Sequence, residues 1–108
     1  MTDAIRDVRA VLTPMQHTLV NAGLRLAVKH GFDHVSRAMV AAKTGVSEAL
    51  LSYYWTAPMY QNAMMRQAIE TRNLTVVAQG LAAQHPVALA APADLQREAA
   101  NSLVRDLT

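Results

Sequence analysis

The sequence contains no cysteine, and this absence excludes disulfide bonds. It also lacks a long apolar run. The most apolar region, residues 74–92, is interrupted by Gln79, Gly80, Gln84, His85 and Pro86, so no run approaches the ~20 residues of a membrane span. The first residues, MTDAIRDVRAVL, have no continuous apolar core of the kind that signal peptides carry. We therefore expect a cytoplasmic protein that does not enter a membrane.

Apolar residues are nonetheless abundant. They make up 52% of the 108 residues, which is enough for one compact core but not for a second, ligand-binding domain. The formal net charge is only +2. Between residues 13 and 60, four basic residues outnumber Asp33 and Glu48, which gives 4 − 2 = +2 for this segment. The basic excess therefore lies around the central part of the sequence.

The spacing of glycine and proline predicts an all-α fold. Alternation of polar and apolar residues, the signal of strands, is not sustained anywhere. Residues 1–57 are expected to form a three-helix head with a short N-terminal extension, which includes a helix over residues 3–12. Residues 58–108 are expected to form a helical region packed on the head as one compact domain, with helices from Pro58 to about Gln79 and from Pro92 to Leu107.

The segment GVSEALLSYYW, Gly45 to Trp55, differs from an ordinary buried helix because aromatic residues stand beside small polar ones. Two short helices, capped by Ser36 and Ser47, are expected on either side of a turn at Gly45, where a positive φ is easily reached. Leu51 should face the core and Trp55 should close the second helix. Two short helices joined by a tight glycine turn are the helix-turn-helix pattern.

From Leu19 onward, LVNAGLRLAVKHGFDHVSRAMVAAKTGVSEALLSYYW resembles the DNA-binding region of TetR-family transcriptional repressors. The landmarks that carry the resemblance are Gly31-Phe32, Ser36, Val40-Ala41, Gly45-Val46-Ser47, Leu51 and Trp55. Two positions depart from the family: Ser52 replaces a tyrosine that commonly contacts phosphate, and Pro58 replaces a lysine. The large ligand-sensing domain of the family is expected to be missing here, and with it a pocket for a small-molecule inducer.

A recognition helix presents its N-terminal residues to base edges in the major groove. The expected base-reading residues are Glu48, Ala49, Leu50 and Tyr53. Glu48 is suited to accept a hydrogen bond from cytosine N4, and Ala49 and Leu50 to pack on thymine methyl groups. Hydroxyl groups and cations nearby are expected to contact phosphates: Ser36, Arg37, Lys43, Ser47, Ser52, Tyr54 and Thr56.

Catalysis and metal binding are not expected. His30 and His34 have a spacing that suits zinc on a helix, but Gly31 breaks the helix between them and no third ligand is nearby. Ser47 lacks the strained elbow of a nucleophilic serine, so it is interpreted as a helix cap. No cluster of acids, bases and nucleophiles can be assembled, so we expect neither an enzyme nor a cofactor.

One helix-turn-helix covers too few base pairs to select a single genomic site, so we expect a homodimer on a palindromic operator. Apolar stripes in the second half are the expected dimer interface: Ala63, Ile69, Leu74, Val77, Leu95, Ala99, Leu103 and Leu107. The sequence thus predicts a small transcriptional repressor, with a plasmid or phage origin suggested by its size. The alternative is a helical adaptor or antirepressor that binds a protein through the same helices.

Overall fold

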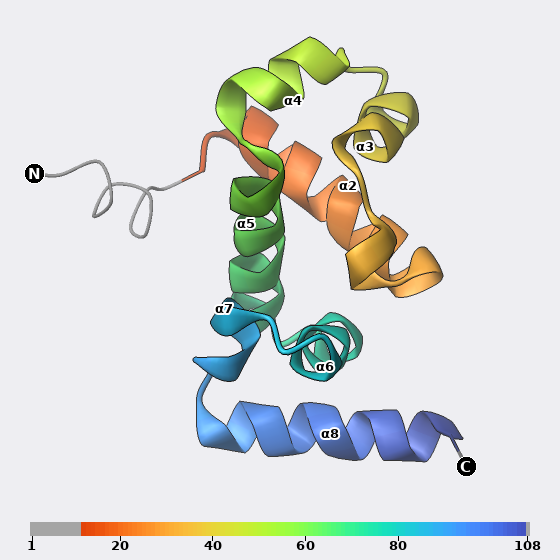
Figure 1. Ribbon diagram of the computed structural model, residues 1–108, viewed down its shortest axis with the longest axis vertical. Coiled ribbons are helices and arrows are strands. Elements are labelled where there is room, and N and C mark those ends of the chain that lie inside the picture. Colours follow the sequence, from red (N-terminus) through yellow and green to blue (C-terminus); the bar gives the residue numbers. More distant parts are fainter. Residues whose placement is uncertain (1–11, 108) are drawn as a thin grey trace, which may run out of the picture.

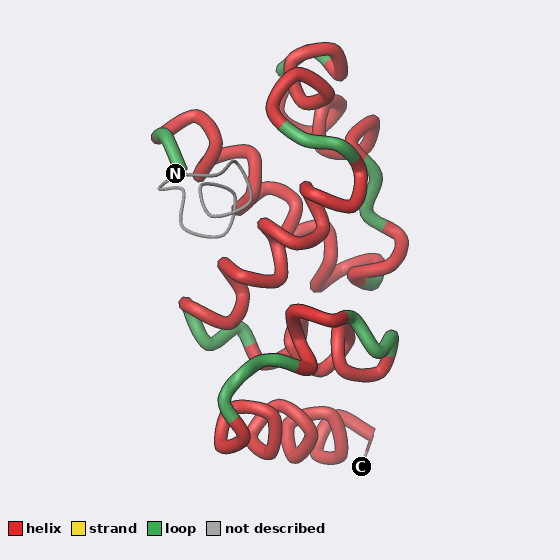
Figure 2. Tube along the Cα trace, turned by 60° about the vertical axis from the view of Figure 1, so that its left-hand side comes forward, coloured by secondary structure: helices red, strands yellow, loops and turns green. Residues whose placement is uncertain are grey.

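The computed structural model describes residues 12–107, and these residues are helical and connected by short loops (Figures 1 and 2). The elements are α2 (Pro14–His30), the 3-10 helix η1 (Phe32–His34), α3 (Arg37–Thr44), α4 (Glu48–Tyr54), α5 (Ala57–Glu70), α6 (Leu74–Ala82), α7 (Pro86–Leu89) and α8 (Ala93–Leu107). The all-α prediction is confirmed. Residues 3–11 of the helix expected near the N-terminus lie outside the described residues.

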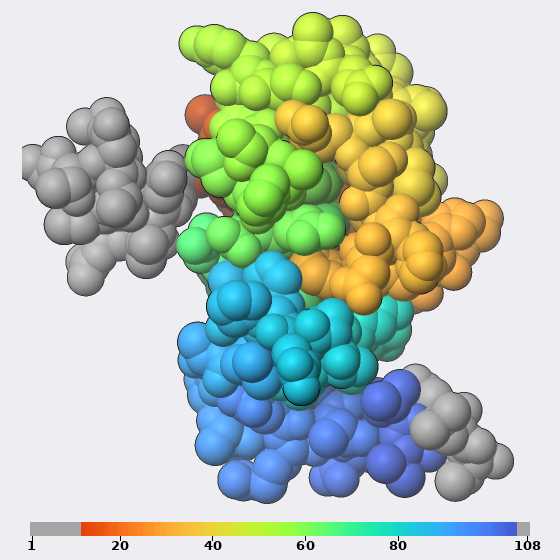
Figure 3. Space-filling view, viewed as in Figure 1, coloured from red at the N-terminus to blue at the C-terminus, as the bar shows by residue number. Residues whose placement is uncertain are grey.

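The helices are arranged along the longest axis of the molecule, which extends 41 Å. Figure 1 shows α3 and α4 at one end, α2 and α5 in the middle, and α6, α7 and α8 at the other end. In the space-filling view, α4 covers the top of the molecule and α8 its base (Figure 3). One cluster of buried side chains nevertheless runs from α2 through α5 to α8. The two ends therefore share a single hydrophobic core.

Side-chain caps start the helices of the head where the sequence predicted them. Thr13 forms a capping box with Gln16 at the start of α2, and Ser36 and Ser47 accept hydrogen bonds from Met39 N and Leu50 N. These bonds satisfy backbone donors that the first turn of a helix leaves unpaired. Gly45 ends α3 in the left-handed conformation, with φ of 76°. The predicted caps of α3 and α4 and the turn at Gly45 are thus confirmed.

The single long helix expected from Pro58 to about Gln79 is wrong, because α5 ends at Glu70 and α6 begins at Leu74. Arg72 adopts a left-handed conformation with φ of 55°. Asn73 N then donates to Ala68 O and Arg72 N donates to Ile69 O, which is the Schellman pattern of a helix end. The Asn73 side chain caps the start of α6. The apolar residues keep a helical spacing across this turn, so the sequence pattern did not indicate the break between α5 and α6.

Gly80 was expected to end a helix, but it lies inside α6. A Cβ at this position would overlap the Met65 methyl and would lie 2.9 Å from the Ala88 Cβ. The missing side chain therefore allows α5 and α7 to approach α6 closely. The helix ends two residues later, at Ala82, and the chain then turns at Gln84, which has φ of 57°, while His85 N donates to Gly80 O. The short helix α7 follows, and the sequence analysis did not anticipate it.

Half of the residues expected at the dimer interface are instead buried within the protomer. Figure 1 shows α8 crossing beneath α6, and the side chains buried within the protomer are Ala63, Val77, Leu95 and Ala99. Ile69 and Leu74 are half-buried, whereas Leu103 is 42% exposed. The side chain of Leu107 lies outside the described residues. Of the described positions, Leu103 is thus the one most open to a partner.

Phe32 joins the head to the C-terminal layer of α6, α7 and α8. Its backbone N–H donates to Gln79 Oε1 at 3.0 Å, and its ring packs edge-on against the His85 ring with centroids 5.3 Å apart. His85 in turn caps α7, because its Nδ1 accepts a hydrogen bond from Val87 N. Phe32 is buried in the core, and its ring also fixes the position of α7.

The His85 cap makes stability depend on pH. Burial lowers the pKa of His85, and nearby Arg66 lowers it further while Asp33 raises it. The folded state therefore favours the neutral ring, so its contribution is fully present above ~6.5, the unperturbed histidine pKa, and is lost as the pH falls below it. Protonation of Nδ1 also removes the acceptor for Val87 N. We expect His85→Asn, which can cap but not titrate, to show a shallower loss of stability in urea unfolding between pH 7.5 and 5; equal losses would contradict the assignment.

Candidate nucleic-acid interface

The helices α3 and α4 form the helix-turn-helix unit that the sequence predicted. Val40 of α3 and Leu51 of α4 are fully buried and belong to the same core. Gly45 provides the left-handed turn between the helices, and open space surrounds the position that a Cβ would occupy there. Glycine is therefore required at position 45 by the positive φ of the backbone and not by contacts with neighbouring atoms. The unit holds α4 at one end of the molecule with one side on the core (Figure 1).

The opposite side of α4 is exposed. Ala49 and Tyr53 lie four residues apart, which places them on one face of the helix, and Tyr53 is 81% exposed. Glu48 is also exposed, whereas Leu50 is half-buried. Of the four expected base-reading residues, the structure thus brings Ala49 and Tyr53 together on the outer face of α4. Leu50 is partly withdrawn toward the core.

A row of aromatic rings connects this surface to the interior. Tyr53 lies 5.6 Å from Tyr54 between ring centroids, Tyr54 lies 5.5 Å from Trp55, and Trp55 lies 5.1 Å from Tyr60. Trp55 and Tyr60 are buried, as was expected for Trp55. Tyr54 is half-buried, so its ring supports Tyr53 from behind. The exposed Tyr53 ring is therefore the outer member of a packed series.

Sequence reasoning missed the role of Tyr60 in positioning this unit. Its hydroxyl donates a hydrogen bond to Leu19 O at 2.6 Å, which ties the start of α5 to α2. Burial raises the pKa of the Tyr60 hydroxyl, so the group remains protonated and able to donate. A tyrosine four residues after the Thr56 cap falls on the inner face of a new helix, and this periodicity was the available signal.

Arg37 was expected to contact phosphate, but its guanidinium is engaged within the protein. Nη1 donates to Ser52 Oγ at 3.1 Å and to the Trp55 backbone oxygen at 3.0 Å. The Trp55 oxygen lies at the C-terminal end of α4, where helix carbonyls lack intrahelical partners and favour a cation. Arg37 therefore links the first turn of α3 to the last turn of α4. This link fixes the angle of α4 relative to α3, which the sequence alone could not reveal.

Removing this link should loosen α4. We expect Arg37→Met, which keeps an apolar stem but no donor, to lower the free energy of unfolding by ~1–2 kcal/mol, since it leaves the Trp55 oxygen without its partner. Ser52→Ala is the matched control, because it removes one acceptor and retains the bond to Trp55. Urea unfolding of both variants tests the assignment. A loss for Ser52→Ala as large as that for Arg37→Met would show that the Trp55 bond contributes nothing.

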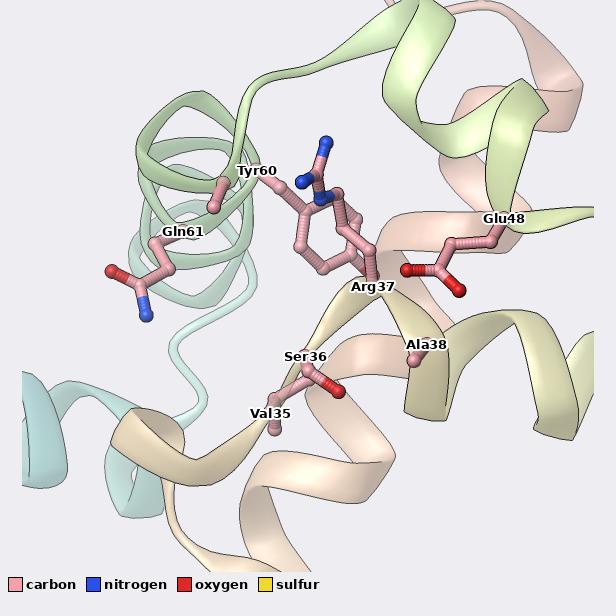
Figure 4. Close-up of a pocket in the computed structure, with 8 residues that line it drawn as sticks. Val35, Ser36, Arg37, Ala38, Glu48, Tyr60 and Gln61 are labelled. Atoms are coloured by element: carbon pink, nitrogen blue, oxygen red, sulfur yellow. The ribbon is translucent and has the colours of Figure 1, made fainter.

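A cavity of about 250 Å³ lies between the N-terminal turns of α3, α4 and α5 (Figure 4). Its polar lining comes from Ser36, Arg37, Glu48 and Gln61, and the rest of the lining comes from Val35, Ala38, Ala57 and Tyr60. In Figure 4 the Glu48 carboxylate extends toward the first turn of α3, and the Arg37 guanidinium points away from it. The cavity is thus lined by groups of both charges and is not a simple anion site.

The hydroxyl groups expected at the phosphates act as helix caps. Ser36, Ser47 and Thr56 each accept a hydrogen bond from a backbone N–H in the first turn of the helix that follows. A hydroxyl that accepts one bond still has its own hydrogen to donate, so capping is compatible with a phosphate contact. All three side chains are exposed, as is Lys43 at the end of α3. These four residues remain available to a DNA backbone.

Among the described residues, no helix has the length and apolar character needed to cross a membrane. The same part of the chain also lacks any group of three or more histidine, cysteine, aspartate or glutamate side chains suited to a metal ion.

Comparison with known proteins identifies a family match for this unit. Residues 19–57 match the family model of bacterial regulatory proteins, tetR family. The match begins in α2 and ends at the first residue of α5, so it includes α3, the Gly45 turn and all of α4. No curated protein and no solved structure matches the chain. Residues 19–57 are therefore similar to the helix-turn-helix, DNA-binding region of tetR-family transcriptional regulators.

Proposed function

We propose that the protein is a transcriptional repressor that binds a palindromic operator as a homodimer and blocks transcription by occupying the site. The observation that carries this proposal is the exposed face of α4, with Ala49 and Tyr53, inside a segment that matches the tetR family model. The exposed caps Ser36, Ser47 and Thr56, together with Lys43, supply donors for the DNA backbone. Contacts to base edges would then determine which DNA sequence is bound. Contacts to the DNA backbone would position the protein along the duplex.

Dimerisation through α8 fits the arrangement of the helices. Because α8 and α4 lie at opposite ends of the molecule (Figure 1), a partner bound at α8 would leave both recognition helices free. The last turns of α8 expose Leu103 and Val104, at 42% and 59%. The interface is therefore proposed at the end of α8 rather than along its whole stripe. A two-fold dimer would present its recognition helices to half-sites that lie one helical turn, ~34–36 Å, or a multiple of it apart.

We also propose that repression needs no small-molecule inducer. In the C-terminal layer and the adjoining α5, side chains fill the interior: Met64, Met65, Val76 and Val77 are fully buried. These buried methionine and valine side chains pack closely and leave little volume for a ligand between α5 and α6.

Selection of bound duplexes from a random DNA pool, with the purified protein at physiological salt, tests the proposed function. Enrichment of an inverted repeat is the expected result. Enrichment of a single half-site would support DNA binding and contradict the palindrome. If a folded protein enriches no sequence, the repressor assignment fails and the adaptor or antirepressor alternative takes its place. That alternative is favoured by one observation: α4 carries Glu48 and no lysine or arginine.

Salt dependence separates the two functions. DNA binding that involves Z phosphates weakens with a log-log slope of about −0.9Z, whereas an apolar protein contact responds little to salt. If four donors contact phosphate in each protomer, the affinity for the selected duplex should fall steeply between low and physiological salt.

Leu103→Asp should separate the dimer. The carboxylate would lie in the proposed interface, where burying an unpaired charge costs several kcal/mol, while the folded protomer tolerates it at an exposed position. Sedimentation should show a folded monomer, and binding to the full palindrome should weaken to that of one half-site. A variant that still sediments as a dimer would move the interface away from the end of α8.

A further inference from the structure

We infer that α4 reads its half-site mainly through thymine methyl groups rather than through hydrogen bonds to purines. The inference rests on the proposed operator binding and specifies its chemistry. It follows from which side chains α4 carries, which of them face outward, and how the outermost ring is held.

The first step concerns side chains that α4 lacks. Arginine and lysine make bidentate contacts to guanine O6 and N7, and asparagine and glutamine make them to adenine N6 and N7. None of these four residue types occurs between Thr44 and Thr56. The two nearest cations are on α3, where Arg37 is bonded to Ser52 and Trp55. Lys43 stands at the far end of α3, one turn before the recognition helix begins. The strongest hydrogen-bond contacts to purines are therefore not available from α4.

The second step concerns the polar side chains that α4 does carry. Ser52 Oγ accepts a hydrogen bond from Arg37, which holds it on the side of α4 that faces α3. The Glu48 carboxylate extends toward the first turn of α3, where Arg37 and Ala38 lie (Figure 4). Both groups thus lie on the side of α4 that faces α3. The outward stripe of α4 is left to the Ala49 methyl group and the Tyr53 ring, which are exposed.

The third step is the match between this stripe and the major groove. The thymine C5 methyl is the apolar group that base pairs present there, and side chains such as alanine contact it directly. The Tyr53 ring is 81% exposed and is supported by Tyr54, with ring centroids 5.6 Å apart. A supported ring loses little conformational freedom when it binds, because its position is already restricted. Ala49 and Tyr53 together form a surface for neighbouring thymines.

The test uses the duplex that the selection yields, with single bases replaced. Deoxyuridine in place of thymidine keeps base pairing and removes the methyl group, and 7-deazaguanine in place of guanine removes the N7 acceptor. We expect uracil at the contacted positions to weaken binding about four-fold per methyl, the factor that corresponds to one buried methylene. The 7-deazaguanine duplexes should bind as well as the unmodified one.

Two variants assign the effect to Tyr53. Tyr53→Ala should bind thymine and uracil duplexes equally at the position that the ring contacts. Tyr53→Phe, the matched control, keeps the ring and should retain the preference for thymine. If 7-deazaguanine weakens binding while uracil does not, the methyl-reading inference is wrong and operator binding still stands. If no duplex is selected at all, the proposed function and this inference fail together.

Discussion

Leu95→Asp should destabilise the protein by ~4 kcal/mol or more, because it removes a buried side chain and places a carboxylate in its position. Leu95 is 1% exposed and belongs to the core cluster that includes Val76 and Val77 of α6. None of the buried residues in the described part of the chain is charged, so the new charge would have no buried partner. The carboxylate can avoid burial only by taking up a proton or by detaching α8 from α6.

Leu103→Asp, eight residues later on the same helix, is the matched control. Leu103 is 42% exposed, so its carboxylate remains hydrated in the protomer and the substitution should cost ~0.5 kcal/mol or less there. Urea unfolding at several protein concentrations distinguishes the two sites. The loss from Leu95→Asp should not depend on concentration, and it should shrink at low pH as the carboxyl group is protonated. Any loss from Leu103→Asp should grow with concentration, since it would come from the proposed dimer. Equal, concentration-dependent losses at both sites would show that α8 is not held on α6 as the structure places it.

The contrast between these two leucines shows what the sequence could and could not predict about α8. Apolar residues at every fourth position predicted a helix with one apolar face, and α8 is that helix. Periodicity does not say whether the face packs within the chain or against another one. Leu95 and Ala99 pack within the chain because α6 passes over the first turns of α8, and this depends on the bend at Arg72.

That bend could not be predicted because the helix ends lack their usual residue. Glycine is the common residue at a left-handed helix end, and in this protein Arg72 and Gln84 occupy two such positions. Conversely, Gly80 looks like a helix end and is needed for close packing. The head was easier to predict because its signals are local: each cap bonds within three residues of itself.

The same contrast between local signals and long-range packing applies to the candidate site. The exposure of Tyr53 followed from helical periodicity, since Leu51 and Trp55 define the inner side. The hydrogen bonds of the Arg37 guanidinium could not be predicted from periodicity, because its partners Ser52 and Trp55 are 15 and 18 residues away in the sequence. A long charged side chain near a helix start can face solvent or reach a neighbouring helix, and only the packing of α3 against α4 decides between them.

Gly23→Ala should cost ~2–4 kcal/mol, although alanine is intrinsically the better helix former by ~1 kcal/mol. A Cβ at Gly23 would overlap the Tyr60 hydroxyl oxygen and would lie 2.7 Å from Met64 Sδ. The methionine can rotate away. The tyrosine cannot do so easily, because its ring is 1% exposed, packs against Trp55 and is bonded to Leu19 O. Moving it would leave a buried hydroxyl and carbonyl without their mutual hydrogen bond, which accounts for much of the expected loss.

A double-mutant cycle with Tyr60→Phe isolates this contact. Alone, Tyr60→Phe should cost ~1 kcal/mol for the lost hydrogen bond. Combined with Gly23→Ala, it removes the atom that the new methyl group overlaps, although the ring carbon behind it would still lie 3.1 Å from the Cβ. Gly23→Ala should therefore cost ~1–2 kcal/mol less in the Tyr60→Phe variant than in the unaltered protein, a coupling typical of residues in direct contact. Additive losses in urea unfolding would show that Met64 or the backbone, rather than the Tyr60 hydroxyl, limits the approach of α2 to α5.

Because Tyr60 also supports Trp55 at the end of α4, Gly23→Ala should weaken operator binding even under conditions where the protein remains folded.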